Sequence, residues 1–302
     1  MEAVRRLGGR FVAIGEPLYP PWLRHGDAPP PLIAVRGDVR HLASPAIAIV
    51  GSRNASVAGR KMAALLARGL GEAEFAIVSG LARGIDSAAH EAALASGTIA
   101  VFAGGLDCIY PPENEALFER ILETGGCAVS EMRLGWEPRA RDFPRRNRII
   151  AGIALATIVV EAAERSGSLI TARLAMEQNR DVFAVPGSPL DPRAAGSNGL
   201  IKQGAQMVTE VKDVIDATVP LLSRPPELPP SALQAPASDA PAAEPADSDR
   251  GRVVEALGPS PVEIDEIIRF TGLSTRIVHI VLLELDLAGR VERHGGQRIS
   301  LR

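Results

Sequence analysis

The sequence predicts an α/β protein: a doubly wound parallel sheet of Rossmann type, followed by a small C-terminal helix-turn-helix domain with a wing. Three observations support this fold class. Short apolar, β-branched runs alternate with helical stretches over residues 46–220, as in a parallel sheet with crossover helices. Proline and alanine then dominate residues 221–249. Residues 250–302 show three helical apolar patterns and a glycine-centred hairpin, which predicts a separate small domain.

Composition describes an ordinary globular chain. A net charge of −3 over 302 residues gives no global sign of a nucleic-acid partner, so any such signal must be local. Cys108 and Cys127 have neither paired zinc-ligand spacing nor the density of a secreted disulfide framework. The start of the chain has no apolar core with a cleavage site, and no run of about 20 apolar residues follows. We therefore expect a cytoplasmic protein without a membrane segment.

Residues 1–45 predict an entry segment rather than a domain. Prolines at 20, 21 and 29–31 interrupt it too often for regular structure. LIAVRGD (32–38) predicts one short strand. Because the segment is too short to fold alone, we expect it to pack on the core and to cover part of the sheet.

Residues 46–220 predict the Rossmann-like domain, with six strands and five crossovers. The predicted strands are AIAIVG (46–51), FAIVSG (75–80), TIAVFAGG (98–105), CAVSEM (127–132), TIVVEA (157–162) and DVFAVPG (181–187). The helical stretches between them include GRKMAALLARGLGE (59–72), SAAHEAALAS (87–96), NEALFERILETG (114–125) and SLITARLAMEQN (168–179).

Glycine, hydroxyl and arginine residues follow one strand after another, where such sheets bind ligands. Backbone N–H groups of glycine turns, hydroxyls and arginines on one sheet edge suit phosphate oxygens. The segments concerned are GSR (51–53), SGLARGID (79–86), GGLD (104–107), the arginine-rich loop 133–148, SGS (166–168) and PGS (186–188).

FPRRNRIIAG (143–152) is the most unusual of these stretches. It places three arginines and Asn147 directly before an apolar helical run. Pro144 suits the first position of a helix, where its missing N–H is not needed. Cations are badly placed at the positive end of a helix, which indicates that an anion binds there. A solvated basic turn explains the same residues.

Several of these residues also have a purely structural explanation. GSR alone is usually only a tight turn, and Asp86 can cap a helix that begins at Ser87. His90 has no partner at metal-ligand spacing, which favours a packing or surface role. Glu131 and Glu161 can act as acid–base groups or can neutralise arginines. Agreement over five or six successive strands favours a binding site.

The motifs that are missing narrow the choice of anion. Gly51 is followed by Ser-Arg-Asn, so the first strand lacks the dinucleotide fingerprint, and the sequence has neither a Walker A motif nor a G-x-S-x-G elbow. Loop 133–148 contains six arginines against Glu137 and Asp142, with Trp136 and Phe143 among them. Arginines interleaved with aromatic residues favour single-stranded nucleic acid, whose bases can stack on them.

With these motifs, residues 15–215 resemble the bacterial DNA-processing protein A family, DprA/Smf. The resemblance implies an extended Rossmann fold that binds single-stranded DNA and loads the RecA recombinase on it during natural transformation. It also implies a homodimer formed through the Rossmann-like domain, with no catalytic activity, no cofactor and no metal. The matching stretches are GSRNASVAG (51–59), SGLARGID (79–86), GGLDCIYPPEN (104–114), FPRRNRIIAG (143–152), VVEAAERSGSLITARLA (159–175) and FAVPG (183–187).

The resemblance carries a set of DNA-binding residues onto this chain. It implies phosphate contacts by arginines, stacking on Phe143, hydroxyl donors, and two glycines that let the backbone approach the ligand. Asn147 either contacts DNA or ties the loop together. The residues are Gly51, Ser52, Arg53, Phe143, Arg146, Asn147, Arg148, Ser166, Gly167, Ser168 and Thr171.

One departure concerns the N-terminus. Many family members carry a helical domain, similar to a sterile alpha motif, ahead of a YPPWL-like segment. This chain begins almost at that segment (19–23). The expectation is that the domain is absent or that the start is truncated, so functions attached to it are not carried over.

Residues 221–249 predict a semi-extended Pro/Ala-rich linker, too poor in large apolar residues to fold. Residues 250–302 predict helix, helix, helix and a hairpin around Gly295-Gly296, with Ser274 or Thr275 as the N-cap of the third helix. This pattern resembles the winged helix at the end of many DprA proteins. Eight arginines against seven acidic residues are a weak signature of duplex DNA binding, so protein contact or self-association remains an alternative.

Two other functions fit a Rossmann-like chain of this kind. One is a hydrolase of nucleotides or nucleotide-sugar phosphates, against which PGSPLDP (186–192) stands where a PGG-x-GT-x-x-E signature is expected. The other is a transcription regulator that binds duplex DNA through the winged helix and uses the Rossmann-like domain as a sensor.

Overall fold

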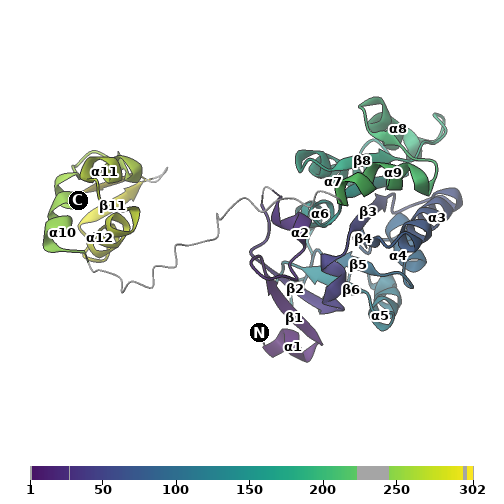
Figure 1. Cartoon of the computed structure of the whole chain (residues 1–302), viewed down its shortest axis with the longest axis horizontal. Helices are drawn as coiled ribbons and strands as arrows, with labels where there is room; N and C mark the ends of the chain where they lie inside the picture. Colours follow the sequence, from purple (N-terminus) through teal and green to yellow (C-terminus); the bar gives the residue numbers. More distant parts are fainter. Residues whose placement is uncertain (1, 27, 223–244, 295–297, 302) are drawn as a thin grey trace. The chain divides into compact units, whose positions relative to one another are not determined.

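The computed structural model describes residues 2–26, 28–222, 245–294 and 298–301. The chain divides into two compact units, Met1–Pro230 and Ser231–Arg302, which are described separately (Figure 1). Most of the predicted linker, residues 223–244, lies outside the described residues. Its predicted ends belong to helices, since Leu222 ends α9 (Val211–Leu222) and Asp247 begins α10 (Asp247–Glu255).

The first unit is built on one mixed sheet. Seven neighbouring strands are parallel, which confirms the doubly wound class, and the two strands at one edge are antiparallel. In spatial order the strands of the described sheet are β1 (Gly9–Ala13), β2 (Leu32–Gly37), β6 (Cys127–Ser130), β5 (Thr98–Val101), β4 (Ala76–Ser79), β3 (Ala46–Gly51), β7 (Ala156–Val160), β8 (Asp181–Ala184) and β9 (Gln206–Met207).

The entry segment joins the sheet rather than only covering it. β2 pairs with β6, and β1 pairs with β2, so residues 9–37 extend one edge of the sheet. Between these strands the chain leaves the sheet plane, and Tyr19 and Leu23 enter the apolar core. The phenol of Tyr19 donates a hydrogen bond to the carbonyl of Pro30 (2.7 Å), which closes this loop on itself.

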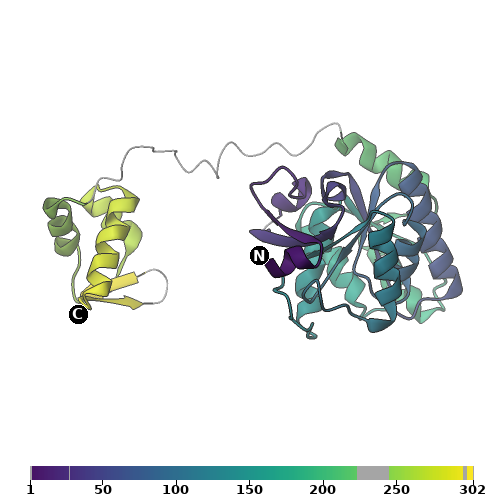
Figure 2. The ribbon, with the colours of Figure 1, turned by 90° about the horizontal axis from the view of Figure 1, so that it is seen from below.

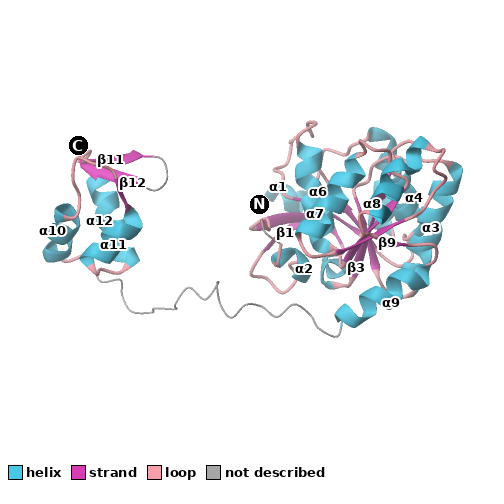
Figure 3. Ribbon diagram, turned by 90° about the horizontal axis from the view of Figure 1, so that it is seen from above, coloured by secondary structure: helices cyan, strands magenta, loops and turns pink. Residues whose placement is uncertain are grey.

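Helices cover both faces of the sheet (Figure 3). Alternate residues of β3 explain this, since Ala46, Ala48 and Val50 point to one core and Ile47 and Ile49 to the other. The first face carries α2 (Pro21–Arg24), α6 (Asp142–Ile153), α7 (Gly167–Glu177) and α8 (Ala195–Lys202). The second carries α3 (Val57–Glu72), α4 (Ile85–Ala92), α5 (Glu115–Glu123) and α9 (Val211–Leu222). Short helical segments complete the unit: α1 (Glu2–Arg6), η1 (Val39–Ala43), η2 (Pro112–Asn114) and η3 (Pro192–Ala194).

The order of the strands reverses next to β3. The chain runs from β3 through α3 to β4 on one side, whereas β7 pairs with the other side of β3. Such a switch point opens a crevice at the carboxyl ends of the strands, because the flanking connections diverge there. The loops after β3, β4 and β7 meet at this crevice.

Helix α6 begins two residues earlier than Pro144, the predicted first position. Its first residue is Asp142, so Pro144 is the third and still needs no N–H partner. The carboxylate of Asp142 lies in the first turn, where it complements the positive end of the helix. The arginines that follow therefore sit further along the helix than the sequence predicts.

The second unit is a winged helix, as predicted. Ser274 is the N-cap of α12 (Thr275–Leu287), and its hydroxyl accepts from the N–H of Ile277. A short strand that the sequence did not predict, β10, pairs with β12 and makes the sheet three-stranded. Figure 2 shows β11 and β12, in yellow, beside the helices of this unit. The predicted turn at Gly295-Gly296 lies outside the described residues. The elements are α10 (Asp247–Glu255), β10 (Val262–Glu263), α11 (Ile264–Thr271), α12 (Thr275–Leu287), β11 (Val291–His294) and β12 (Arg298–Leu301).

The described residues lack both a membrane-spanning helix and a cluster of metal ligands. In that part of the chain, no helix combines the length and the apolar character that a membrane crossing requires. The same residues contain no group of three or more His, Cys, Asp or Glu side chains that could hold a metal ion.

Candidate nucleic-acid interface

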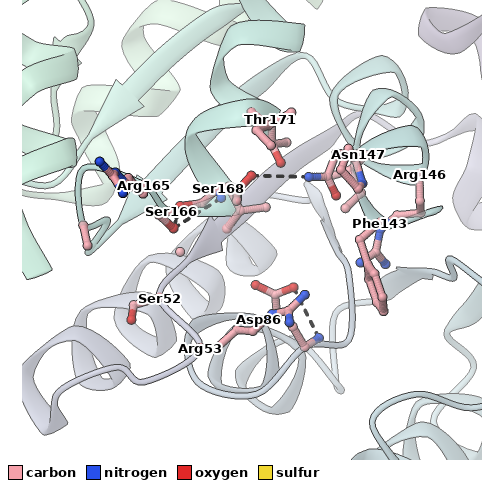
Figure 4. Close-up of a pocket in the computed structure, with 18 of the residues that line it drawn as sticks. Ser52, Arg53, Asp86, Phe143, Arg146, Asn147, Arg165, Ser166, Ser168 and Thr171 are labelled. Atoms are coloured by element: carbon pink, nitrogen blue, oxygen red, sulfur yellow. Dashed lines mark hydrogen bonds between the residues drawn. The ribbon is translucent and has the colours of Figure 1, made fainter. Parts of the chain in front are cut away.

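A cleft of about 810 Å³ opens at the carboxyl ends of β3, β4 and β7. Figure 4 shows Ser166, Ser168 and Thr171 of α7 and its N-cap on one side, with Phe143, Arg146 and Asn147 of α6 opposite them. Ten of the eleven predicted site residues line this cleft. They are Gly51, Ser52, Arg53, Phe143, Arg146, Asn147, Ser166, Gly167, Ser168 and Thr171.

The loop after β3 is held by backbone contacts that leave Arg53 exposed. A Cβ on Gly51 would overlap the carbonyl of Val160, so only glycine fits there. The N–H of Ser52 donates to the carbonyl of Glu161 (2.7 Å), and the N–H of Ile85 donates to the carbonyl of Ser52 (3.2 Å). The direction in which Arg53 projects is therefore set by β7 and α4.

Arg53 stacks on Phe143, one of two aromatic rings that contact each other. Its guanidinium carbon lies 5.2 Å from the ring centre of Phe143, within cation–π range. Phe143 in turn lies 5.3 Å from the ring centre of Tyr110, with the two planes tilted by 58°. Among the residues that the structure describes, Arg53 has no carboxylate within ion-pair distance. The rim thus holds an exposed cation beside exposed ring surface.

Arg146 makes contacts inside the protein that the sequence did not predict. Its side chain is 5% exposed, and its Nη1 donates to the carbonyls of Gly80 (2.8 Å) and Val101 at the ends of β4 and β5. Burial lowers the pKa of Arg146 to about 10, and the charge of Asp86 opposes that effect. A Cβ on Gly80 would crowd the guanidinium. Arg146 therefore fastens α6 to the sheet.

Asp86 completes this internal arrangement. It lies in the first turn of α4, and its carboxylate accepts from the N–H groups of Gly80 (3.1 Å) and Ala82 (3.3 Å). Burial raises the pKa of Asp86, while Arg146 and the two N–H groups act in the opposite direction. Asp86 thus organises the loop after β4 instead of capping a helix at Ser87.

The start of α7 forms the opposite wall. Ser166 is the N-cap, and its hydroxyl accepts from the N–H of Ser168 (3.3 Å) and shares a hydrogen bond with the Ser168 hydroxyl (2.7 Å). Asn147 Nδ2 donates to the carbonyl of Gly167 (3.4 Å), which links α6 to α7. A Cβ on Gly167 would meet no atom within 4 Å. Folding therefore does not require glycine at this position.

The structure does not bring Arg148 into the cleft. Its guanidinium pairs with the carboxylate of Glu131 and donates to the carbonyl of Ala28 (2.6 Å). Arg145 also pairs with Glu131 (3.0 Å). Successive helical residues turn by about 100°, so the third and fourth residues after Phe143 share its face and the fifth does not. Glu131 is thus a partner of arginines, one of its two predicted roles.

Sequence reasoning missed part of the lining. Arg165 lies at the rim, exposed, with no carboxylate within ion-pair distance in the described part of the chain. Its position directly before the N-cap of α7 was an available signal, because a cation there gains nothing from the helix dipole. The other lining residues not predicted as site residues include Asn54, Ala82, Asp86, Tyr110, Pro138 and Ala140.

Glu161 and His90 hold the scaffold together. Glu161 has a φ of 52° at the end of β7, and its carboxylate accepts from the N–H of Ser56 (2.8 Å) and from its hydroxyl. His90 is fully buried and bonds Thr98 (2.6 Å), which is the predicted packing role. Glu161 thus joins the end of β7 to the start of α3, and His90 joins α4 to β5.

Comparisons with known proteins agree with this fold. The family model described as DNA recombination-mediator protein A matches residues 10–219, and that of the DprA winged helix domain matches residues 228–297. Protein Smf of Escherichia coli is 39% identical over 287 residues, which cover 94% of this chain and 75% of that protein. DNA processing protein DprA of Streptococcus pneumoniae is 48% identical over 188 residues, 62% of this chain and 66% of that protein.

Solved structures give the same result. DNA processing protein A from S. pneumoniae matches with a TM-score of 0.65 at 44% identity, over 69% of this chain and 74% of that one. DNA processing protein A from Helicobacter pylori, solved to study its single-stranded DNA binding mode, matches with a TM-score of 0.63 at 28% identity, over 70% of this chain and 96% of that one. The chain belongs to the DNA recombination-mediator protein A family of DNA-processing proteins.

Proposed function

We propose that the cleft binds single-stranded DNA, with phosphates on its arginines and a base on its aromatic pair. The observation that carries this proposal is Arg53, exposed, without a carboxylate partner among the described residues, and stacked on Phe143. A phosphate and a neighbouring base could occupy such a pair together, since stacking on aromatic rings tolerates any base. The single-stranded DNA binding of the H. pylori relative supports this assignment.

The walls of the cleft suit the sugar-phosphate backbone. Arg165 at the start of α7 offers a second cation. The hydroxyl of Ser52 and one hydroxyl of the bonded Ser166–Ser168 pair can donate hydrogen bonds to phosphate oxygens. The dipole of α7 adds positive potential at its first turn. Arg146 supports this site from below without contacting the ligand.

Three charge-neutralising variants test the proposal. Arg53→Gln and Arg165→Gln should each weaken binding of labelled oligothymidylate by roughly tenfold and reduce the slope of log K against log salt by about 1. Arg173→Gln removes the same charge from the outer surface of α7, where Arg173 pairs with Glu177 (3.4 Å), and should leave both quantities unchanged. Fluorescence anisotropy at several salt concentrations measures them.

Equal losses in all three variants would mean that net charge, rather than the cleft, governs binding. If neither Arg53→Gln nor Arg165→Gln lowers the affinity, the cleft is not the DNA-binding site.

The proposal assigns a binding role rather than catalysis. Among the described lining residues the carboxylate is that of Asp86, and it is bonded to two backbone N–H groups below the surface. We further propose that the protein delivers the bound strand to a RecA recombinase in the cytoplasm. In that role it would act as a homodimer through the Rossmann-like unit. Exposed apolar side chains such as Leu65 of α3 (53% exposed) and Val219 of α9 (46%) are compatible with self-association.

A further inference from the structure

The loop between β6 and α6 carries a second group of arginines on an aromatic residue, outside the contacts assigned so far. The guanidinium carbons of Arg133 and Arg139 lie 5.5 Å and 5.3 Å from the ring centre of Trp136. Both arginines are exposed, and in the described ranges neither has a carboxylate within ion-pair distance. The arrangement repeats that of Arg53 on Phe143.

Three hydrogen bonds fix Trp136 and the residue before it, so this arrangement is formed before any ligand arrives. The N–H of Gly105 donates to the carbonyl of Trp136 (2.9 Å), and the N–H of Gly135 donates to the carboxylate of Asp107 (2.9 Å). The indole Nε1 donates to the carboxylate of Asp142 (3.0 Å). An interaction surface held in this way loses little conformational entropy on binding.

Asp142 connects this loop to the cleft. Its carboxylate also accepts from the N–H of Arg139 (2.9 Å), and these two bonds, that from Arg139 first, lower the pKa of Asp142. The next residue along α6 is Phe143. One carboxylate therefore fixes the spacing between the two aromatic residues, and Pro138 and Ala140, between them in sequence, line the cleft.

We propose that Trp136, with Arg133 and Arg139, is a second contact point for single-stranded DNA on the rim of the cleft. The proposal rests on the proposed function. A base would stack on the indole or on a guanidinium plane, and the arginines would contact phosphates on either side of it. The carboxylates of Asp107 and Glu137 lie in or beside this loop and would keep the phosphates on the arginine side.

The sequence provides a direct probe, because Trp22 and Trp136 are its two tryptophans. Trp22 lies under the guanidinium of Arg180 (4.6 Å) and does not line the cleft. The full-length Trp22→Phe variant thus reports on Trp136 alone, and Trp136→Phe reports on Trp22. Titration with oligothymidylate should quench the tryptophan emission of Trp22→Phe. The quenching should saturate over the same concentration range as the binding of labelled oligonucleotide. The same titration should leave Trp136→Phe unquenched.

Affinity as a function of oligonucleotide length gives the second readout. Trp136→Ala and Arg139→Gln should weaken binding of long oligothymidylates at least about fivefold. Neither should affect the shortest oligonucleotide that the native protein binds, because that one fills the cleft alone. Trp136→Phe keeps a stacking surface and should stay within about twofold of the native protein for all lengths.

The outcomes separate this proposal from the one on which it rests. If oligothymidylate binds in an Arg53-dependent way while Trp136 emission and long-oligonucleotide affinity stay unchanged, the second contact point is wrong and the cleft assignment stands. A loss in Trp136→Ala that is equal for all lengths would mean that Trp136 only supports the cleft, which also overturns the proposal. Absence of binding to the native protein would overturn the proposed function itself.

Discussion

Gly167 separates the demands of folding from those of binding at a single residue. It is the first residue of α7, its φ is not positive, and a methyl group there would meet no protein atom within 4 Å. Gly167→Ala should therefore keep the unfolding free energy or raise it by up to about 1 kcal/mol. In the cleft, the methyl would hold a phosphate away from the start of α7. We expect oligothymidylate affinity to fall about tenfold, which is about 1.4 kcal/mol.

Gly199→Ala is the matched control. Gly199 lies in α8, its added methyl would also meet no atom within 4 Å, and it does not line the cleft. This variant should show a similar change in stability, measured by urea unfolding, with unchanged affinity. If Gly167→Ala binds as tightly as Gly199→Ala, close approach at the start of α7 is not part of recognition.

For individual residues, the sequence predicts the types of side chain at the cleft better than the role of each one. The residue types at the cleft could be predicted, because glycines, hydroxyls and arginines follow successive strands. The individual roles of Arg146 and Arg148 could not. A two-residue difference on a helix separates an arginine that bonds the sheet from one that pairs with Glu131. That outcome depends on where β4, β5 and β6 end, which tertiary packing decides.

At the scale of elements, His90 couples α4 to the sheet. The hydroxyl of Thr98 donates to the carbonyl of Ile77 (2.9 Å), so it accepts from His90, whose Nδ1 must carry the proton. The Nε2 of His90 is then a buried acceptor without a partner among the described residues. Protonation there would place a charge in the core, and burial accordingly lowers the pKa of His90 to about 3.

This pKa predicts a loss of stability in acid. The unfolded imidazole binds a proton near pH 6.5 and the folded one only near pH 3, so between these values the unfolded state holds more protons. Stability should be complete above pH 6.5 and fall as the pH decreases, by up to about 4 kcal/mol near pH 3. His90→Gln can still donate to Thr98 and does not titrate. Urea unfolding from pH 7 to pH 4 should show a smaller decline for this variant, and parallel declines would contradict the assignment.

Element prediction succeeded where apolar side chains dictate the strand. β3, β4, β6, β7 and β8 are buried runs, and each was predicted within a few residues. The missed strands lie at sheet edges. Both residues of β9 are exposed, and β1 and β10 have few buried side chains. Such strands are defined by the partner whose backbone they meet, and that information is absent from the local sequence.

At the scale of the whole molecule, the chain has two separate apolar cores. The core clusters of the first unit lie between Val12 and Val214, and that of the second between Val253 and Ile299. All residues of the cleft and the Trp136 loop belong to the first unit. Each unit therefore has the apolar core that independent folding requires.

Removal of residues 223–302 should thus leave single-stranded DNA binding intact. We expect the truncated chain to bind oligothymidylate with an affinity within about twofold of that of the full chain. The slope of log K against log salt should also be the same, because it reports how many phosphates the cations of the cleft neutralise. The second unit exposes acidic residues such as Asp265 and Glu266 as well as arginines such as Arg269 and Arg276, so its contribution to duplex binding should also be small. Anisotropy with single- and double-stranded oligonucleotides at several salt concentrations measures both. A tenfold loss for the single strand would mean that the winged helix shares the site, and a loss confined to duplex DNA would assign it duplex binding of its own.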